Sequence, residues 1–347
     1  MRVTLFQIPT FVTLKTRPIR IVPLVLCLAI SALHSARAEQ RNIAQLTAAA
    51  ERGDAETQYR LGQAYVRGVG VRKDIVRAHG LFKQAAEQGH AEAIGGLGYF
   101  YANGFVVKQD LAEAAEWFRK GAEKGGTRAQ VNYALALLHG RGVALNEAEG
   151  MQWIEKAAAH GQPHAFYVQG ECFFNGTFGH PQDYGKAREL FLKAAESDHA
   201  AAENMLGVIH QDGLGVAADL AVAESWFRKG AEQGDAKAQS NLGQLIGPDV
   251  EDEAKRIESL KWLLLAYNAN EPMARNVLNV ILRTRPPHVL KEAQRQAAEF
   301  KIRPAAEGKQ DADAKPEARS SPRYCRVTAA RPAPTDARLN AVSPNIF

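Results

Sequence analysis

The sequence predicts an all-α fold built from stacked helix–turn–helix units that repeat about every 36 residues. One small or turn-forming slot recurs at spacings of 36 or 37, and it is filled by Gly53, Gly89, Gly125, Gly161, Asp198, Gly234 and Asn270. Between these slots, apolar and small residues fall at steps of three and four, which is the spacing of a helical face. A unit of this size cannot bury its apolar face alone, so the pattern predicts a stack of repeats.

Each unit contains two predicted helices. In the first unit, one helical face carries Ala55, Gln58, Leu61, Gly62 and Tyr65, and the next carries Ala78, Leu81, Phe82, Ala85 and Ala86. Gly68 and Gly70 lie between them and can adopt the positive φ that ends a helix. Asp74 follows and can cap the second helix through its side-chain oxygen.

Small residues predict close packing within each unit. Glycine in the middle of a helix costs about 1 kcal/mol relative to alanine, so a close approach of two backbones is the expected compensation. The glycines are Gly62, Gly98, Gly207 and Gly243, and the alanines expected opposite them are Ala78, Ala114, Ala187 and Ala223. We expect the tryptophans to fill the gaps between hairpins rather than to stack on a ligand; they are Trp117, Trp153, Trp226 and Trp262.

These motifs resemble the Sel-one-like repeat, a relative of the tetratricopeptide repeat. The matching pattern is Ala-x-x-x-x-x-Leu-Gly-x-x-Tyr, Gly-x-Gly-Val, Asp, Ala-x-x-Trp-Phe and Ala-Ala-x-x-Gly, and it covers residues 43–300. The resemblance implies a right-handed superhelical solenoid that acts as an adaptor. In the family such adaptors commonly work in a bacterial envelope, in signalling, exopolysaccharide control or host contact.

Residues 1–38 have the pattern of a signal peptide. They contain five basic residues and no acid, an apolar run at residues 21–33, and the sequence Ala36-Arg37-Ala38. These are the basic region, the short apolar region and the A-x-A cleavage site of an exported protein. The run is shorter than the roughly 20 residues of a membrane-spanning helix. We expect cleavage after Ala38, a periplasmic or secreted protein, and no stable membrane insertion; a retained N-terminal membrane anchor is the alternative.

The remaining chain divides into four parts. Residues 39–52 predict an N-terminal capping helix, residues 53–269 six repeats, and residues 270–302 degenerate C-terminal capping helices. Terminal units differ because an exposed stacking face would aggregate. Residues 303–347 are rich in Ala, Pro and Arg and poor in apolar side chains, which is the composition of disorder. This tail is basic, and we hypothesise that it competes for the partner site.

Charge argues against a nucleic-acid partner. The chain has 43 basic and 38 acidic residues, but five of the basic residues lie in the predicted signal peptide. The mature chain is therefore neutral, whereas a nucleic-acid-binding domain is expected to carry a basic patch and a high positive charge.

No motif predicts catalysis, a cofactor or a metal site, so we expect a protein that is not an enzyme. His160 and His164 are four residues apart, but Gly161 and Pro163 place them in a turn rather than on one helical face. After cleavage two cysteines remain. Cys172 falls in a core slot, and a disulfide to Cys325 is the alternative.

The leading hypothesis is an exported adaptor or regulatory scaffold that binds a protein or peptide through the concave face of the solenoid. The alternative is an envelope enzyme, or a hydrolase accessory, with a site in the groove. Residues at two first-helix slots vary in chemistry from unit to unit, which is typical of a binding surface. The candidate partner-binding residues are Arg60, Gln63, Tyr99, Asn132, Leu135, Glu171 and Asn241.

Overall fold

The computed structural model describes residues 43–282 and 285–303, and all secondary structure within these ranges is helical. Residues 43–51 form the first described helix. The first helices of the units follow as α2 (Ala55–Arg67), α4 (Ala91–Asn103), α6 (Thr127–His139), α8 (Pro163–Asn175), α10 (Ala200–Asp212), α12 (Ala236–Ile246) and α14 (Pro272–Ile281). The second helices are α3 (Ile75–Glu87), α5 (Leu111–Glu123), α7 (Glu147–Ala159), α9 (Tyr184–Ala195), α11 (Leu220–Glu232), α13 (Glu253–Asn268) and α15 (Pro287–Glu299).

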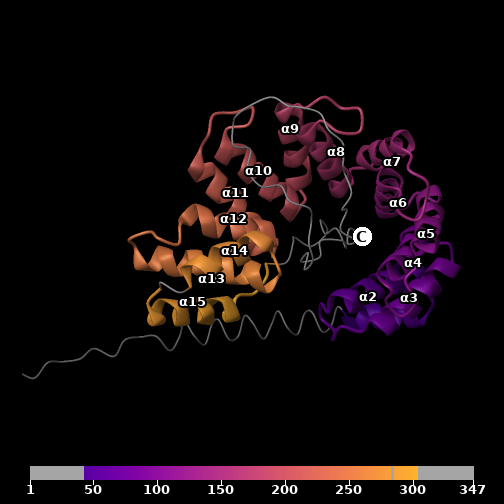
Figure 1. Ribbon diagram of the computed structural model, residues 1–347. Helices are drawn as coiled ribbons and strands as arrows, with labels where there is room; N and C mark the ends of the chain where they lie inside the picture. Colours follow the sequence, from indigo (N-terminus) through magenta and orange to yellow (C-terminus); the bar gives the residue numbers. More distant parts are fainter. Residues whose placement is uncertain (1–42, 283–284, 304–347) are drawn as a thin grey trace, which may run out of the picture.

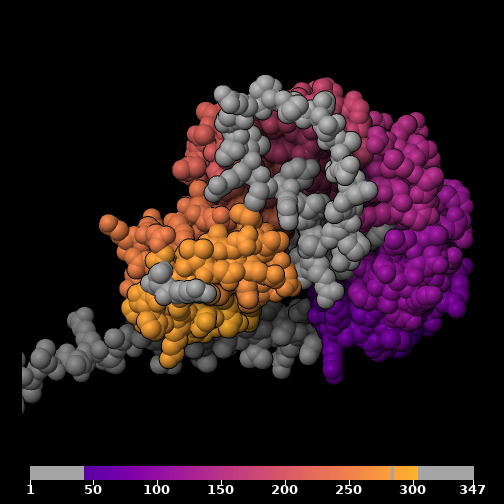
Figure 2. All heavy atoms as spheres, viewed as in Figure 1, coloured from indigo at the N-terminus to yellow at the C-terminus, as the bar shows by residue number. Residues whose placement is uncertain are grey.

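The helix pairs stack into a right-handed solenoid that curves as an arc (Figure 1). First helices contact one another across unit boundaries, as α4 does with α6, α6 with α8, and α10 with α12. They therefore line the inner side of the arc, while α3, α5, α9 and α11 lie outside (Figure 1). Figure 2 shows the resulting two arms, the N-terminal arm in indigo and purple and the C-terminal arm in orange. The predicted solenoid is confirmed.

The turns are made by the residues that the repeat pattern singled out. The recurring slot has a positive φ in every unit, including the non-glycine residues Asp198 (57°) and Asn270 (64°). Gly68 and Gly70 have φ values of 74° and 66°, and Asp74 accepts a hydrogen bond from the Arg77 amide at 2.9 Å. We call the loop between the first and second helix of a unit its hinge, and the side of the solenoid that carries these loops the hinge edge.

The core is filled mainly by the residue that follows each tryptophan. Phe118 is fully buried, and its ring lies so close to Gly98 that a Cβ there would come within 2.7 Å of it. The same contact joins Gly62 to Phe82, Gly207 to Phe227, Gly170 to Phe191 and, with leucine, Gly243 to Leu263. The predicted close approach is correct, but an aromatic ring, more than the facing alanine, occupies the space.

The tryptophans lie at the margin of this core. Trp262 is 2% exposed, whereas Trp117, Trp153 and Trp226 are half-buried. A lysine ammonium lies over each indole, at 4.9 Å for Lys120 on Trp117 and at 4.0 Å for Lys229 on Trp226. The prediction that tryptophan fills the core therefore holds fully only for Trp262.

The two ends of the stack are covered by additional helix and chain. Ala50 of the first helix is buried, and its carbonyl accepts a hydrogen bond from Gln58 Nε2 at 3.1 Å. At the other end α15 packs on α13. Beyond α15 the chain returns to the fifth unit, where the Arg303 amide donates to the Glu232 carbonyl at 2.7 Å. None of the helices in residues 43–303 that the structure describes is both long and apolar enough to cross a membrane.

Candidate functional site on the inner surface

Side chains join the N-terminal ends of successive first helices. Gly126, the N-cap of α6, has no side chain to satisfy the first amides of that helix. Glu92 from the preceding unit replaces it and accepts hydrogen bonds from the amides of Thr127 at 2.7 Å and Arg128 at 3.3 Å. Gln162, at the start of α8, donates to Thr127 Oγ1 at 3.3 Å. A carboxylate is well suited to this place because exposed amides give a helix N-terminus a partial positive charge.

A tyrosine ring and a histidine ring pack against each other in a tilted arrangement at the junction of the first two units. The rings of Tyr59 and His90 are 4.8 Å apart, and His90 Nε2 lies 2.9 Å from Glu56 Oε2. The Tyr59 hydroxyl accepts hydrogen bonds from Gln63 Nε2 at 2.6 Å and from Arg128 Nη1 at 2.7 Å. Arg128 belongs to α6, so this contact joins the first unit to the third. We call Glu56, Tyr59, Gln63 and His90 the first quartet.

The same arrangement returns three units later. His164, Tyr167, Glu171 and His199 occupy the slots of Glu56, Tyr59, Gln63 and His90, and we call them the second quartet. The rings of Tyr167 and His199 stack at 4.9 Å, and the Tyr167 hydroxyl donates to Glu171 Oε1 at 2.7 Å. His164 Nδ1 and His199 Nε2 are 3.1 Å apart. The inner surface therefore carries two quartets in equivalent slots; the carboxylate contacts a histidine in the first and the tyrosine hydroxyl in the second.

Hydrogen bonding fixes the histidine tautomers in both quartets. The Ala202 amide donates to His199 Nδ1 at 3.2 Å, so the proton of the neutral ring lies on Nε2 and is donated to His164. His90 receives the Ala93 amide in the same way at 3.1 Å. Desolvation of the enclosed ring, assisted by the neighbouring His164, lowers the pKa of His199 to about 3. His199 thus stays neutral at physiological pH and acts as a structural donor.

The seven predicted partner-binding residues lie on five first helices and not in one pocket. Arg60 is exposed, and the other six are half-buried. Gln63 and Glu171 belong to the two quartets. Asn241 of α12 donates from Nδ2 to Asn204 Oδ1 of α10 at 2.8 Å. Tyr99 packs against Phe105, with ring centroids 5.8 Å apart, while Leu135 packs against a core cluster and Asn132 lies one turn before it.

Residues in these slots vary in chemistry from unit to unit, but some of them still pack in the core and help to hold the fold. Val168 shares a slot with Arg60 and Asn132, yet it is 5% exposed and belongs to the core. The sequence interpretation also missed the ring pairs and Arg128. Two features of the sequence could have revealed them. Tyr59 and Tyr167 are three periods apart, which points to equivalent ring pairs. The Gly95-Gly96 pair leaves the middle of α4 without side chains, which leaves room for a contact between the neighbouring first helices. A Cβ on Gly95 would come within 2.5 Å of Ala129.

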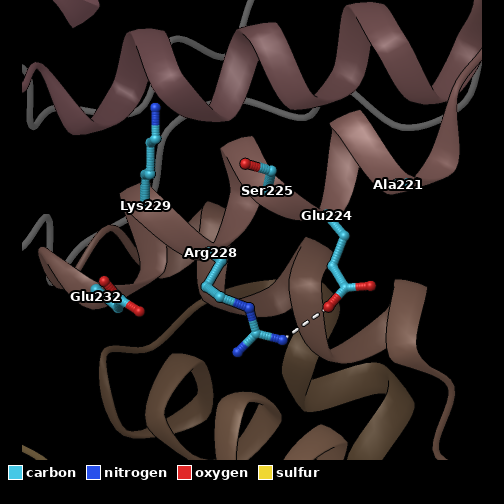
Figure 3. A pocket seen from close by; sticks show the side chains of 6 residues that line it. All are labelled: Ala221, Glu224, Ser225, Arg228, Lys229 and Glu232. Carbon is cyan, nitrogen blue, oxygen red and sulfur yellow. Dashed lines mark hydrogen bonds and ion pairs between the residues drawn. The ribbon is translucent and has the colours of Figure 1, made fainter.

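The outer surface offers an open cleft along α11, lined by Ala221, Glu224, Ser225, Arg228, Lys229 and Glu232 (Figure 3). Its charged side chains contact groups within the cleft and beside it. Arg228 pairs with Glu224 at 2.8 Å and with Glu258 at 2.5 Å. Partly exposed pairs of this kind add little stability, and the cleft combines no nucleophile with a neighbouring base. No group of three metal-ligating side chains occurs among the residues that the structure describes.

Cys172 is a buried thiol in the core of the fourth unit. It is 1% exposed, its Sγ lies 3.9 Å from Met151 Sδ, and burial raises its pKa to about 12. Such a thiol stays protonated and unreactive. Cys325, the alternative disulfide partner, lies outside the described residues.

Comparison with known proteins agrees with this geometry. The Sel1 repeat model matches residues 55–90, 91–126, 127–162, 170–199, 200–235 and 236–271. A protective antigen of uropathogenic Escherichia coli that displays an SLR fold is 33% identical, with a TM-score of 0.50 over 74% of this chain and 56% of that one. A Sel1 repeat protein from Oxalobacter formigenes is 29% identical, with a TM-score of 0.52 over 67% of both chains.

A curated relative, an uncharacterized protein of Neisseria meningitidis, is 32% identical over 116 residues, which are 33% of this chain and 23% of that protein. The chain thus spans less than a quarter of this relative and about half of the Escherichia coli antigen. The family model itself covers more than half of the chain in six consecutive segments, each of one unit. The protein is therefore a member of the Sel1 repeat family.

Proposed function

We propose that this protein is an exported adaptor that binds an extended segment of a partner protein along the inner surface of the solenoid. The observation that carries the proposal is the pair of quartets on the inner first helices. Each holds an aromatic pair beside hydrogen-bonding groups, in equivalent slots three units apart. The second pair, Tyr167 and His199, is stacked and half-buried, whereas Tyr59 of the first pair is buried and supports the surface from below. Rigid aromatic anchors flanked by polar groups are the chemistry of binding hot spots.

The rigidity of this surface supports the proposal. Contacts such as Arg128 to Tyr59 and Asn241 to Asn204 join different units. They fix the spacing of neighbouring first helices before a partner arrives. A preformed surface lowers the entropy that binding must overcome. Tyr99 lies between the two quartets along the chain and is a third anchor, with Asn132 on the next first helix.

Site-specific photo-crosslinking tests the position of the interface. A photoreactive phenylalanine at position 99 or 132 should give a discrete crosslinked product in envelope extracts. The same group at Ser225, an exposed position on the outer helix α11, is the matched control and should give none. Products of equal yield from the outer position would place the interface away from the inner surface.

A double substitution provides the corresponding loss of function. Tyr99→Ala with Asn132→Ala should abolish capture of the crosslinked partner. Both residues are half-buried rather than fully buried, so the helical circular-dichroism spectrum should not change. Unchanged capture by the double variant would contradict the proposal.

Export is proposed from the sequence of residues 1–38, which lie outside the described residues. Mass spectrometry of the protein recovered from the periplasm should find Glu39 at the N-terminus. Recovery of the intact chain from the membrane fraction would instead support the retained anchor.

A further inference from the structure

The hinge edge of the first three units exposes apolar side chains. Val69 is 52% exposed, Phe105 37%, Val106 49% and Leu145 61%. They lie in hinges 68–74, 104–110 and 140–146, which succeed one another along the stack. The same edge therefore presents apolar groups at the tips of three neighbouring loops.

Basic residues accompany these tips. The three hinges contain four basic residues, Arg72, Lys73, Lys108 and Arg141, and two acids, both of which cap helices. Arg72, Lys73 and Lys108 form no ion pair within the described part of the chain. With Arg77 and the ring of Tyr65, Arg72 and Lys73 line an open cleft at the first hinge.

The hinges of the fourth, fifth and sixth units have the opposite charge. Segments 176–183, 213–219 and 247–252 contain five acidic residues and no lysine or arginine. Among the first six hinges, cations and exposed apolar tips therefore occur together in the first three. The loop between α14 and α15 also holds a cation, Arg285, but it forms an ion pair with Asp249.

Val106, one of the exposed apolar side chains, has a strained backbone conformation. It has a φ of 67° in a slot that Gly70, Gly142, Gly179 and Gly215 occupy in other units, all with positive φ. A β-branched residue in this region is strained by about 1–2 kcal/mol. Glycine would relieve the strain, yet the second hinge carries a half-exposed valine.

We propose that the hinge edge of the first three units docks on the surface of an anionic lipid bilayer. Apolar tips enter the interface, and the adjacent cations pair with lipid headgroups, as in other peripheral contacts. A bilayer fits better than a protein because the apolar side chains are carried on the tips of three separate loops, with Arg72, Lys73 and Lys108 beside them, cations that form no ion pair within the described residues. Docking would leave the inner surface open to a partner.

Vesicle co-sedimentation of the full chain tests this surface. The parent should bind vesicles that contain 30% phosphatidylglycerol, release them in high salt, and bind pure phosphatidylcholine weakly. Lys73→Glu with Lys108→Glu should reduce partitioning at least about 30-fold, because each cation near such a surface contributes about 1 kcal/mol and 1.4 kcal/mol is a factor of ten. Lys255→Glu with Lys291→Glu, exposed positions in the C-terminal arm, is the matched control and should bind like the parent.

Val106→Gly separates docking from stability. It should raise the melting temperature, because the strain is removed, and lower partitioning about tenfold, because an apolar tip is lost. All variants keep the same apolar run at residues 21–33, so it contributes equally to each.

Parent-like binding by both hinge variants, or equal binding to neutral vesicles, would overturn the proposal. Binding to polyglutamate without binding to phosphatidylglycerol vesicles would assign the edge to an acidic protein instead.

Discussion

At the scale of single residues, a large side chain fills the space opposite a mid-helix glycine, and it is a phenylalanine at Gly62, Gly98, Gly170 and Gly207 and a leucine at Gly243. The ring and the missing Cβ are complementary, as at Gly98 and Phe118. The sequence pattern identified both positions, but it could not decide between two adjacent aromatic residues. A one-residue step on a helix turns a side chain by about 100°, and only the packed neighbours show which one points inward.

Phe118→Ala should lower the free energy of unfolding by about 3–5 kcal/mol, since it removes a fully buried ring and leaves a cavity. Trp117→Ala is the control, and its effect should be smaller because its indole is half-buried beneath Lys120. Denaturant unfolding of both variants measures the difference. An equal or larger loss for Trp117→Ala would restore tryptophan as the main core residue.

Glu203 is a buried carboxyl group in a slot that holds glutamine in other units. It is 1% exposed and takes the slot of Gln58, Gln130 and Gln239, each of which donates to a carbonyl eight residues earlier. Burial raises the pKa of Glu203 to about 7; Asp198 adds to the increase, and Arg303, Lys229 and a hydrogen bond from Gln233 oppose it. The folded state thus binds more protons than the unfolded state between about pH 4.5 and 7, so stability falls as the pH rises through this range.

Glu203→Gln should therefore stabilise the protein by on the order of 1–3 kcal/mol at pH 8, because the amide needs no proton and can donate as its counterparts do. The gain should disappear below about pH 4.5, where Glu203 is protonated in both states. Thermal melts of parent and variant across this pH range provide the measurement. A stabilisation that is independent of pH would show that the carboxyl does not titrate as described.

At the scale of helices, the start of α6 shows how one unit completes another. The pattern of caps was predictable within a unit, since Asp74 and Asp110 precede their helices directly. The role of Glu92 was not, because its partners lie 35 and 36 residues away. A side chain at Gly126 would be crowded, since a Cβ there would lie 3.1 Å from two backbone carbonyl oxygens.

Glu92→Ala should lower stability by about 1–2 kcal/mol, which is the usual effect of losing an N-cap. Glu56→Ala removes a carboxylate from the equivalent slot of α2 and is the control. It should cost less, because α4 keeps the cap that its own His90 provides. Hydrogen exchange of the first amides of α6 should increase only in the Glu92 variant, and unchanged exchange there would contradict the capping role.

At the scale of the whole molecule, the period and the turn chemistry predict the solenoid, because they recur in every unit. The junctions between units were less predictable. Contacts such as Arg128 with Tyr59 join residues 69 positions apart, and no local pattern specifies them. The same limit applies to the C-terminal end, where the chain after α15 returns to the fifth unit instead of ending the stack.

This returning segment should stabilise the C-terminal arm. The Phe300 ring lies 5.2 Å from Trp262 in an edge-to-face contact, and Arg303 holds Glu232 through its amide and through its guanidinium at 3.1 Å. Truncation after Arg303 keeps these contacts, whereas truncation after Glu299 removes them. The first should melt like the parent, and the second should melt earlier, with faster hydrogen exchange confined to α11, α12 and α13. Because each unit contacts mainly its neighbours, the N-terminal arm should stay protected in both. If the two truncations melt alike, the segment does not hold the arm; if the N-terminal arm also loosens, the solenoid unfolds as one unit.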